Sequence, residues 1–174
     1  MSYFQRFLLC FSLCLSLLCA ACSGDEVNMK ARTENLPAFS LTLPDGWVTN
    51  LPDGMECTAD RCIAGFAKAA SGSRSAITVS VVPNLGKQLA EIAAESMANM
   101  ASHEAVMHVV SQTDTRVEYE GTIKESPARL IATIDAERQQ VGILLLVGEN
   151  DEISSIVSTL RMKNERLNFM PAAQ

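Results

Sequence analysis

The chain has 174 residues, of which 48% are hydrophobic and 20% are charged, and its formal net charge is −6. This length fits one domain of the usual ~100–200 residues together with a targeting segment. The acidic balance argues against nucleic acid as a partner and against a basic surface that would lie on anionic lipid.

The first residues have the pattern of an export signal. Arg6 is the only charged residue before an apolar run from Phe7 to Ala21. A positive start, an apolar run and small residues at its end are typical of a secretory signal peptide. The run is also shorter than the ~20 residues that a membrane-spanning helix needs. We therefore predict that residues 1–21 are a cleaved signal peptide rather than a permanent membrane span.

The end of this run resembles the bacterial lipobox. In the segment Leu18-Cys19-Ala20-Ala21-Cys22, two small residues precede a cysteine whose thiol can form the thioether to lipid. Cys19 stands where the motif usually has leucine, which departs from the pattern. Ordinary cleavage after Ala21 is the alternative and would leave a soluble periplasmic protein. In both cases the mature chain begins at Cys22.

The resemblance to lipoproteins implies that Cys22 carries a diacylglycerol, usually with a further acyl chain such as palmitate. One acyl chain gives marginal membrane binding, whereas two or more anchor a protein stably. Ser23 follows the anchor, and aspartate is absent from this second position. That pattern is similar to lipoproteins of the outer membrane, so we expect the protein to face the periplasm there, with the lipid bilayer as its partner.

Only two of the six cysteines belong to the predicted domain. Cys57 and Cys62 lie outside the signal, and in an oxidising envelope we expect them to form a disulfide bond. A zinc site would need a second pair of ligands nearby, and a redox centre would resemble C-x-x-C rather than C-x-x-x-x-C. The other four, which belong to the signal or the anchor, are Cys10, Cys14, Cys19 and Cys22.

The remainder of the chain divides into three parts. Residues 22–36 are polar and without periodicity, which predicts a flexible tether. Residues 37–163 form the predicted α+β domain, and residues 164–174 are predicted to be a loose C-terminal tail. Alternating or β-branched apolar residues predict strands at 39–43, 63–68, 77–82, 106–110, 116–119, 129–134 and 141–147. Hairpin turns are expected at Glu120-Gly121 and at residues 137–139.

Two segments have helical spacing. In the first, apolar residues recur from Leu85 to Met100, and Asn84 can cap a helix over about 85–101. In the second, Asn150 or Asp151 can cap a final helix. The side chains of that helix expected to face inward are Ile153, Ile156, Val157 and Leu160.

The order of these elements resembles the PsbP-like fold, which includes bacterial envelope lipoproteins of the DcrB type. The residues that carry the resemblance are the run 39–47 with its Pro44-Asp45-Gly46-Trp47 turn, the strand 77–82 followed by a helix, and the closing segment 153–160. The resemblance implies an antiparallel sheet packed with two main helices, in an α/β/α sandwich. It also implies a binding or assembly role without shared catalytic residues.

We found no convincing catalytic group in the sequence. His103 and His108 are too few and too separated for a metal site, and we expect them on the surface. No G-x-S-x-G motif is present, and Ser71-Gly72-Ser73 is better explained as a loop. Glu118 and Glu120 share one strand face, which we interpret as solvated. Trp47 is expected to anchor the core or rim, with a ligand groove as the alternative.

These observations predict a membrane-anchored lipoprotein that acts by binding, without catalytic residues, cofactor or metal. The ligand and the oligomeric state stay open, and another envelope protein is a candidate partner. The alternative is a soluble periplasmic or envelope enzyme with hydrolytic or thiol-redox activity.

Overall fold

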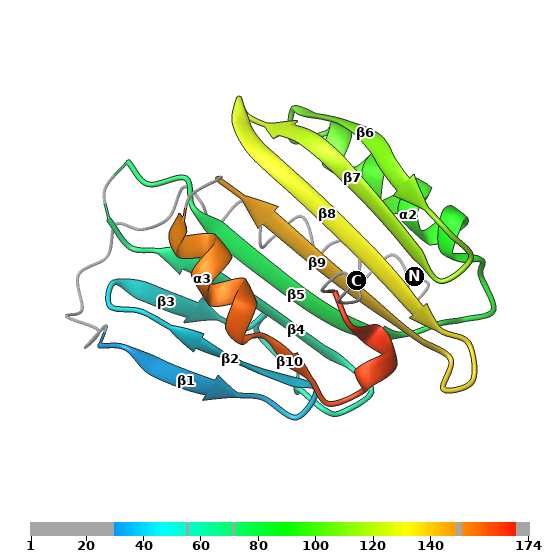
Figure 1. Ribbon diagram of the computed structural model, residues 1–174, viewed down its shortest axis with the longest axis horizontal. Coiled ribbons are helices and arrows are strands. Elements are labelled where there is room, and N and C mark those ends of the chain that lie inside the picture. Colours follow the sequence, from blue (N-terminus) through cyan, green and yellow to red (C-terminus); the bar gives the residue numbers. More distant parts are fainter. Residues whose placement is uncertain (1–29, 55, 71, 149–150, 170–174) are drawn as a thin grey trace.

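The computed structural model describes residues 30–54, 56–70, 72–148 and 151–169 (Figure 1). Their strands form two antiparallel sheets, one of seven strands in the order β3-β4-β5-β9-β8-β7-β6 and one of three in the order β1-β2-β10. In chain order the elements are β1 (Arg32–Asn35), β2 (Phe39–Leu43), β3 (Trp47–Asn50), β4 (Cys62–Lys68), β5 (Ala76–Pro83), α2 (Leu89–Ala101), β6 (Ala105–Gln112), β7 (Arg116–Ile123), β8 (Ser126–Asp135), β9 (Gln140–Val147), α3 (Asp151–Thr159), β10 (Arg161–Met162) and the short 3-10 helix η2 (Glu165–Leu167).

The centre of the large sheet is apolar on both faces. In β9 every residue except Leu146 is buried, as befits a strand that is covered on both faces. Successive side chains of a strand point to opposite faces, so Leu144 and Leu145 belong to different cores. Each fully buried aliphatic side chain of this kind stabilises the fold by about 1.5–3 kcal/mol relative to exposure.

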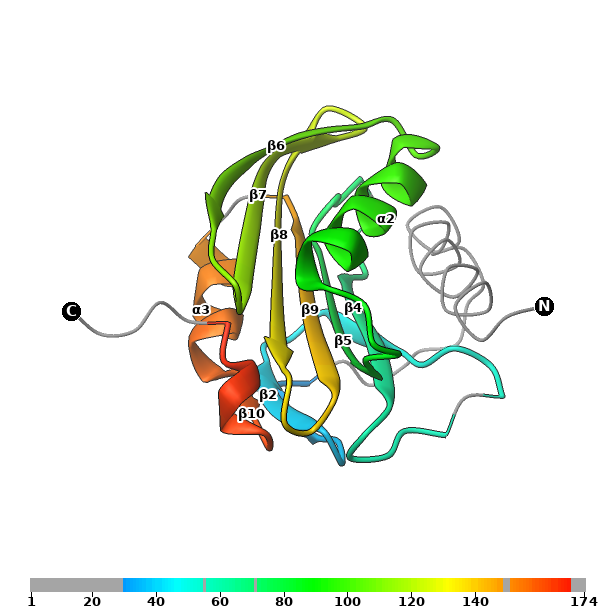
Figure 2. The ribbon, with the colours of Figure 1, turned by 90° about the vertical axis from the view of Figure 1, so that its right-hand side faces the viewer.

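The two helices lie on opposite faces of the large sheet (Figure 2). The helix α2 buries Leu89, Ile92 and Met100 against one face. On the other face α3 contributes Ile153 and Ile156 to a core that the small sheet also enters through β2. The predicted α+β class, with an antiparallel sheet between two main helices, is confirmed.

The folded part begins before the predicted tether ends. The strand β1 falls within residues 22–36 and pairs with β2, with Arg32 opposite Leu43. Its residues are polar, so no apolar alternation marks it as a strand. Side-chain contacts hold it instead: Arg32 donates to the backbone oxygen of Trp47 at 2.9 Å, and Thr49 donates to Glu34 at 2.6 Å.

The prediction of a loose tail from residue 164 is also wrong for the described residues. Leu167 and Phe169 are buried in the core on the α3 face. They fit against the sheet at Gly142, where a Cβ atom would lie 3.0 Å from the Phe169 ring and 3.3 Å from Leu167 Cβ. The glycine of β9 therefore makes the room that the C-terminal segment occupies.

Two local predictions need correction. The first helix begins at Leu89 rather than 85, because the side chain of Asn84 accepts from the N–H of Lys87 at 3.0 Å and forms a turn before the helix. Glu120-Gly121 is no hairpin turn, since both residues lie inside β7. Gly121 marks a close approach of strands: a Cβ atom there would lie 2.0 Å from the backbone oxygen of Val106.

Candidate functional site

The α3 face of the large sheet is only partly covered. In Figure 1 the helix α3 lies over the part of the sheet near β5 and leaves much of β8, β7 and β6 open on the same face. The strand register brings four side chains on this face into one row: Leu146 of β9, Arg129 of β8, Glu120 of β7 and His108 of β6. We call these four residues the cross-strand row.

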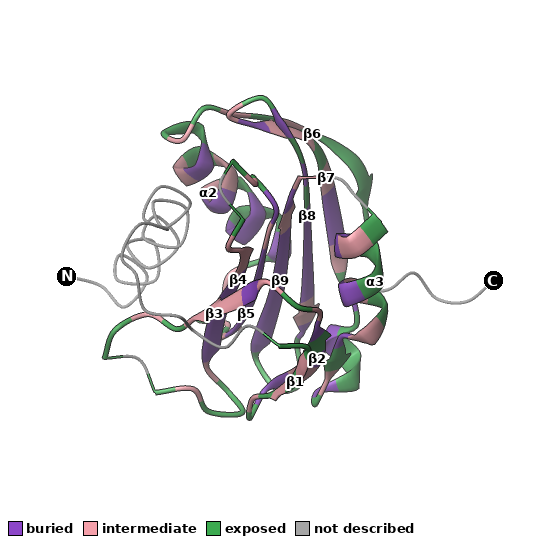
Figure 3. Ribbon diagram, turned by 90° about the vertical axis from the view of Figure 1, so that its left-hand side faces the viewer, coloured by how far each residue is buried: buried purple, intermediate pink, exposed green. Residues whose placement is uncertain are grey.

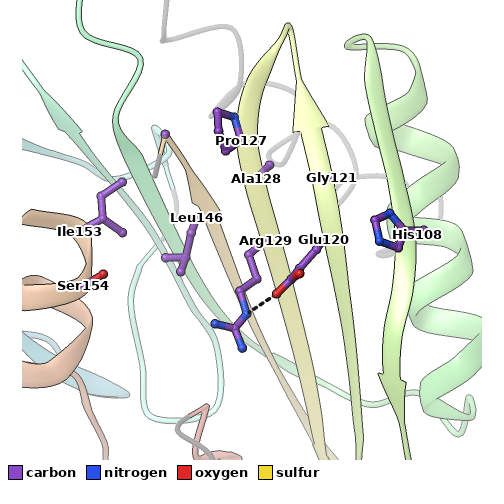
Figure 4. A pocket seen from close by; sticks show the side chains of 10 residues that line it. His108, Glu120, Gly121, Pro127, Ala128, Arg129, Leu146, Ile153 and Ser154 are labelled. Carbon is purple, nitrogen blue, oxygen red and sulfur yellow. Dashed lines mark ion pairs between the residues drawn. The ribbon is translucent and has the colours of Figure 1, made fainter. Parts of the chain in front are cut away.

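The row forms the floor of a pocket between α3 and β6 (Figure 4). The pocket has a volume of about 360 Å³. Ile153 and Ser154 of α3 border it on one side, and His108 borders it on the other. The remaining lining residues are Gly121, Pro127, Ala128 and Gly148.

Beside the row, a buried carboxylate organises the charged side chains. Glu118 is only 7% exposed, and Arg129 contacts it through both Nε, at 2.5 Å, and Nη2. The Nη2 of Arg116 lies 3.3 Å from the second oxygen of Glu118. The same guanidinium donates to the backbone oxygen of Phe169 at 2.9 Å. Because a buried carboxylate needs such partners, Glu118 fixes two arginines.

Arg129 also reaches the rim of the pocket. Its Nε lies 3.7 Å from Glu120 Oε1, and both side chains are about half exposed. Figure 4 shows this pair in the middle of the row, with Leu146 on the α3 side and His108 on the β6 side. The pocket thus has a charged centre between an apolar wall and an imidazole, which suits a ligand with both apolar and polar parts.

The solvated interpretation of the two glutamates holds only for Glu120. Glu118 is buried, although the two lie on the same face, because Arg116 and Arg129 close over it. Val117 and Tyr119 point to the α2 core, as the alternation predicts. Arg129 was not among the predicted site residues, because its only signal is a charge within an apolar strand, and the pairing of that strand with the glutamate strand is seen only in the structure.

The structure brings some predicted site residues together. Cys57 and Cys62 form the predicted disulfide bond, with a Cα–Cα distance of 4.4 Å. Cys22 lies outside the described residues. Trp47 has no exposed surface and belongs to the core of the α3 face, which agrees with the interpretation as a core anchor.

The two histidines lie on different elements. His103 follows α2 and is partly buried, whereas His108 is exposed on β6. Within residues 30–169, apart from the gaps given above, the structure holds no group of three side chains that could bind a metal ion. In the same part of the chain no helix is long and apolar enough to cross a membrane.

Comparison with known proteins finds solved structures of similar fold but assigns the chain to no family. No family model and no curated protein matches the sequence. Among solved structures, the Ran-binding protein Mog1p of Saccharomyces cerevisiae has 11% identity and a TM-score of 0.44, covering 80% of this chain and 98% of that one. A mutant of the protein Mog1 has 12% identity and a TM-score of 0.42, covering 77% and 96%.

Proposed function

We propose that this protein is an envelope lipoprotein of the PsbP-like, DcrB-type family, anchored in the membrane by lipid on Cys22. Its role is non-catalytic: it binds a ligand or an envelope partner in the pocket between α3 and β6. The anchor is supported by the signal-like run that ends in Ala20-Ala21-Cys22. The placement in the outer membrane, facing the periplasm, is supported by Ser23 after the anchor.

The binding role rests on the cross-strand row. Glu118 and Glu120 hold Arg129 and position its guanidinium at the pocket, and Arg116, which also pairs with Glu118, balances the second negative charge. Ion pairs of this kind orient a recognition surface, whereas a hydrolytic site needs a nucleophile beside a base that a third group holds. The apolar wall from Leu146 and Ile153 offers burial to the non-polar part of a ligand.

The test is to fill the pocket from α3 and to compare what stays bound. Ser154 borders the pocket, whereas Ser155 is the next residue of the same helix, is also exposed and does not line it. We expect Ser154→Trp to lose the molecule that co-purifies with the wild-type chain in mild detergent. Ser155→Trp, the matched control, should retain it. Equal retention by both variants would overturn the placement of the binding site.

A further inference from the structure

The strand β6 is the outer strand of the large sheet and pairs only with β7 among the described residues. Its residues from His108 to Gln112 are all exposed, as the green colour of β6 in Figure 3 shows. The strand also carries three of the five large hydrophobic side chains that are exposed in the described chain. These are Val106, Val109 and Val110, which are 73%, 47% and 45% exposed.

Among the described residues, the outer strands β1 and β3 are protected and β10 has only two residues, whereas β6 is long and unprotected. Natural edge strands avoid pairing with other chains by being short or by carrying charges or proline. The strand β3 has four residues and is at least half-buried throughout, and β1 carries Arg32 and Glu34. By contrast β6 has eight residues, Ala-Val-Met-His-Val-Val-Ser-Gln, without lysine, arginine, acidic residue or proline. Its one irregularity is a bulge between Val109 and Ser111.

We propose that β6 pairs antiparallel with β6 of a second copy of this chain about a two-fold axis. Charge favours this occupant: the chain carries −6 overall, so the net charges of two copies repel each other, and a contact between copies is best made through an uncharged segment. The uncharged β6 is a surface where two copies meet without like charges across the contact. A two-fold axis also presents the same strand on both sides of the contact, as a self-complementary interface requires.

The regular part of the strand fixes the register. Pairing before the bulge, over 105–109, centres the axis on Met107 and sets Val106 opposite His108 of the second copy. Residues directly opposite each other share a face, so both side chains of that pair lie on the open face. His108 ends the cross-strand row and lines the pocket. The row then continues into the second copy, whose Val106 extends the wall of the pocket beyond β6.

The contact is small compared with stable interfaces. A single strand pairing over residues 105–109 buries less than the ~1,200–2,000 Å² of a typical specific complex. The dimer is therefore weak in dilute solution. It gains strength where copies share a surface that raises their effective concentration, as a membrane does. Membrane cross-linking of the full chain is for this reason the direct test.

The experiment places one new cysteine at a time on β6 of the full chain and oxidises membranes that contain it. Met107→Cys is expected to give the highest yield of disulfide-linked dimer, since this residue faces its own copy across the axis. Leu85→Cys is the control, because Leu85 is 67% exposed and belongs to the segment between β5 and α2 rather than to β6. Wild type reports the background from the native cysteines, of which Cys57 and Cys62 are already paired.

A charge on the strand provides a second, independent variant. Val106→Lys changes a side chain that is mostly exposed, so folding is preserved, but it adds a charge at the contact of both copies. In the Met107→Cys background it should reduce the dimer yield at least fivefold. The proposal is overturned if Leu85→Cys cross-links as well as Met107→Cys, if no position over 105–109 cross-links, or if β6 cross-links only to a different protein.

Discussion

Arg129 and Glu118 lie on neighbouring strands and form an ion pair on the open face, where Glu118 is only 7% exposed. The pair is diagonal in the register, because Glu118 stands opposite Ile131 and Arg129 stands opposite Glu120. Glu118 therefore draws the Arg129 side chain toward β7, and the position of the guanidinium at the pocket depends mainly on this buried acid.

Removing that acid should weaken the fold and release Arg129. We expect Glu118→Gln to lower the free energy of unfolding by about 1–2 kcal/mol, because hydrogen bonds to a buried charge are lost. Glu120→Gln, at a half-exposed site 3.7 Å from Arg129, should change it by about 0.5 kcal/mol or less. Urea unfolding of both variants measures the difference. Equal effects of the two changes would show that burial of Glu118 has no energetic role.

The close approach at Gly121 gives a prediction for the edge strand. In Gly121→Ala the new methyl group would overlap the backbone oxygen of Val106, so β6 must shift. Overpacking of this kind costs about 1–3 kcal/mol. Compared with wild type, Gly121→Ala should speed hydrogen exchange in β6 and leave β9 nearly unchanged. Thr122→Ala, at the next residue of β7, should leave exchange in β6 as it is in wild type. Unaltered protection of β6 in Gly121→Ala would contradict the close contact.

The C-terminal segment should behave as part of the domain. Phe169 is buried over Gly142, so Phe169→Ala is expected to cost about 3–5 kcal/mol of unfolding free energy. Asn168→Ala, which changes an exposed side chain next to it, serves as control and should cost far less. Thermal or urea unfolding measures both. A Phe169→Ala chain as stable as wild type would restore the idea of a loose tail.

Acid should destabilise the protein partly through Asp135. Burial raises the pKa of this carboxyl, but hydrogen bonds from Asn164 and from the backbone N–H groups of Arg138 and Glu137, with the charge of Arg166, outweigh burial and lower the pKa overall. Because the pKa is lower in the folded protein, the ionised carboxylate stabilises the folded state at pH values above the pKa of the unfolded chain, about 3.9. This stabilisation is lost as the pH falls through the pKa of the folded state.

The measurement is the free energy of unfolding from pH 7 to pH 3. Wild type should lose stability below about pH 4, and Asp135→Asn should lose less over the same range because it has no carboxyl to protonate there. If the two curves run parallel, the Asp135 carboxyl is not linked to folding.

Removal of the disulfide separates a structural role from a redox role. Replacing Cys57 and Cys62 together by serine should lower the free energy of unfolding by about 2 kcal/mol, because the bond closes a short loop. Binding of the ligand to the folded double variant should be unchanged. A double variant that is fully stable yet inactive would instead favour a thiol-redox enzyme.

The sequence predicts those strands and helices whose own apolar side chains repeat with the spacing of a strand or a helix. The strands around Ile77–Val82 and Val141–Val147 and both helices follow from apolar periodicity. Elements that depend on distant partners are missed. The strand that contains Arg32 is polar and forms because it pairs with β2. Leu167 is buried because Gly142, on another strand, leaves room for it.

The candidate site was only partly predictable for the same reason. Alternation placed Glu118 and Glu120 on one face, but which of them is buried depends on where Arg116 and Arg129 reach. No local signal distinguishes the two glutamates. To predict the row of Leu146, Arg129, Glu120 and His108, one must know how four strands are paired residue by residue. The apolar pattern of a single sequence does not give this register.

The measurement that tests the account most directly is a native mass spectrum of the wild-type chain, extracted from its own membrane in mild detergent. The account predicts a chain that starts at Cys22, carries two or three acyl chains there, lacks two protons at Cys57 and Cys62, and retains a non-covalently bound molecule. An unmodified chain that starts at Cys22 with nothing bound would contradict the anchored binding protein and leave a soluble periplasmic domain in its place.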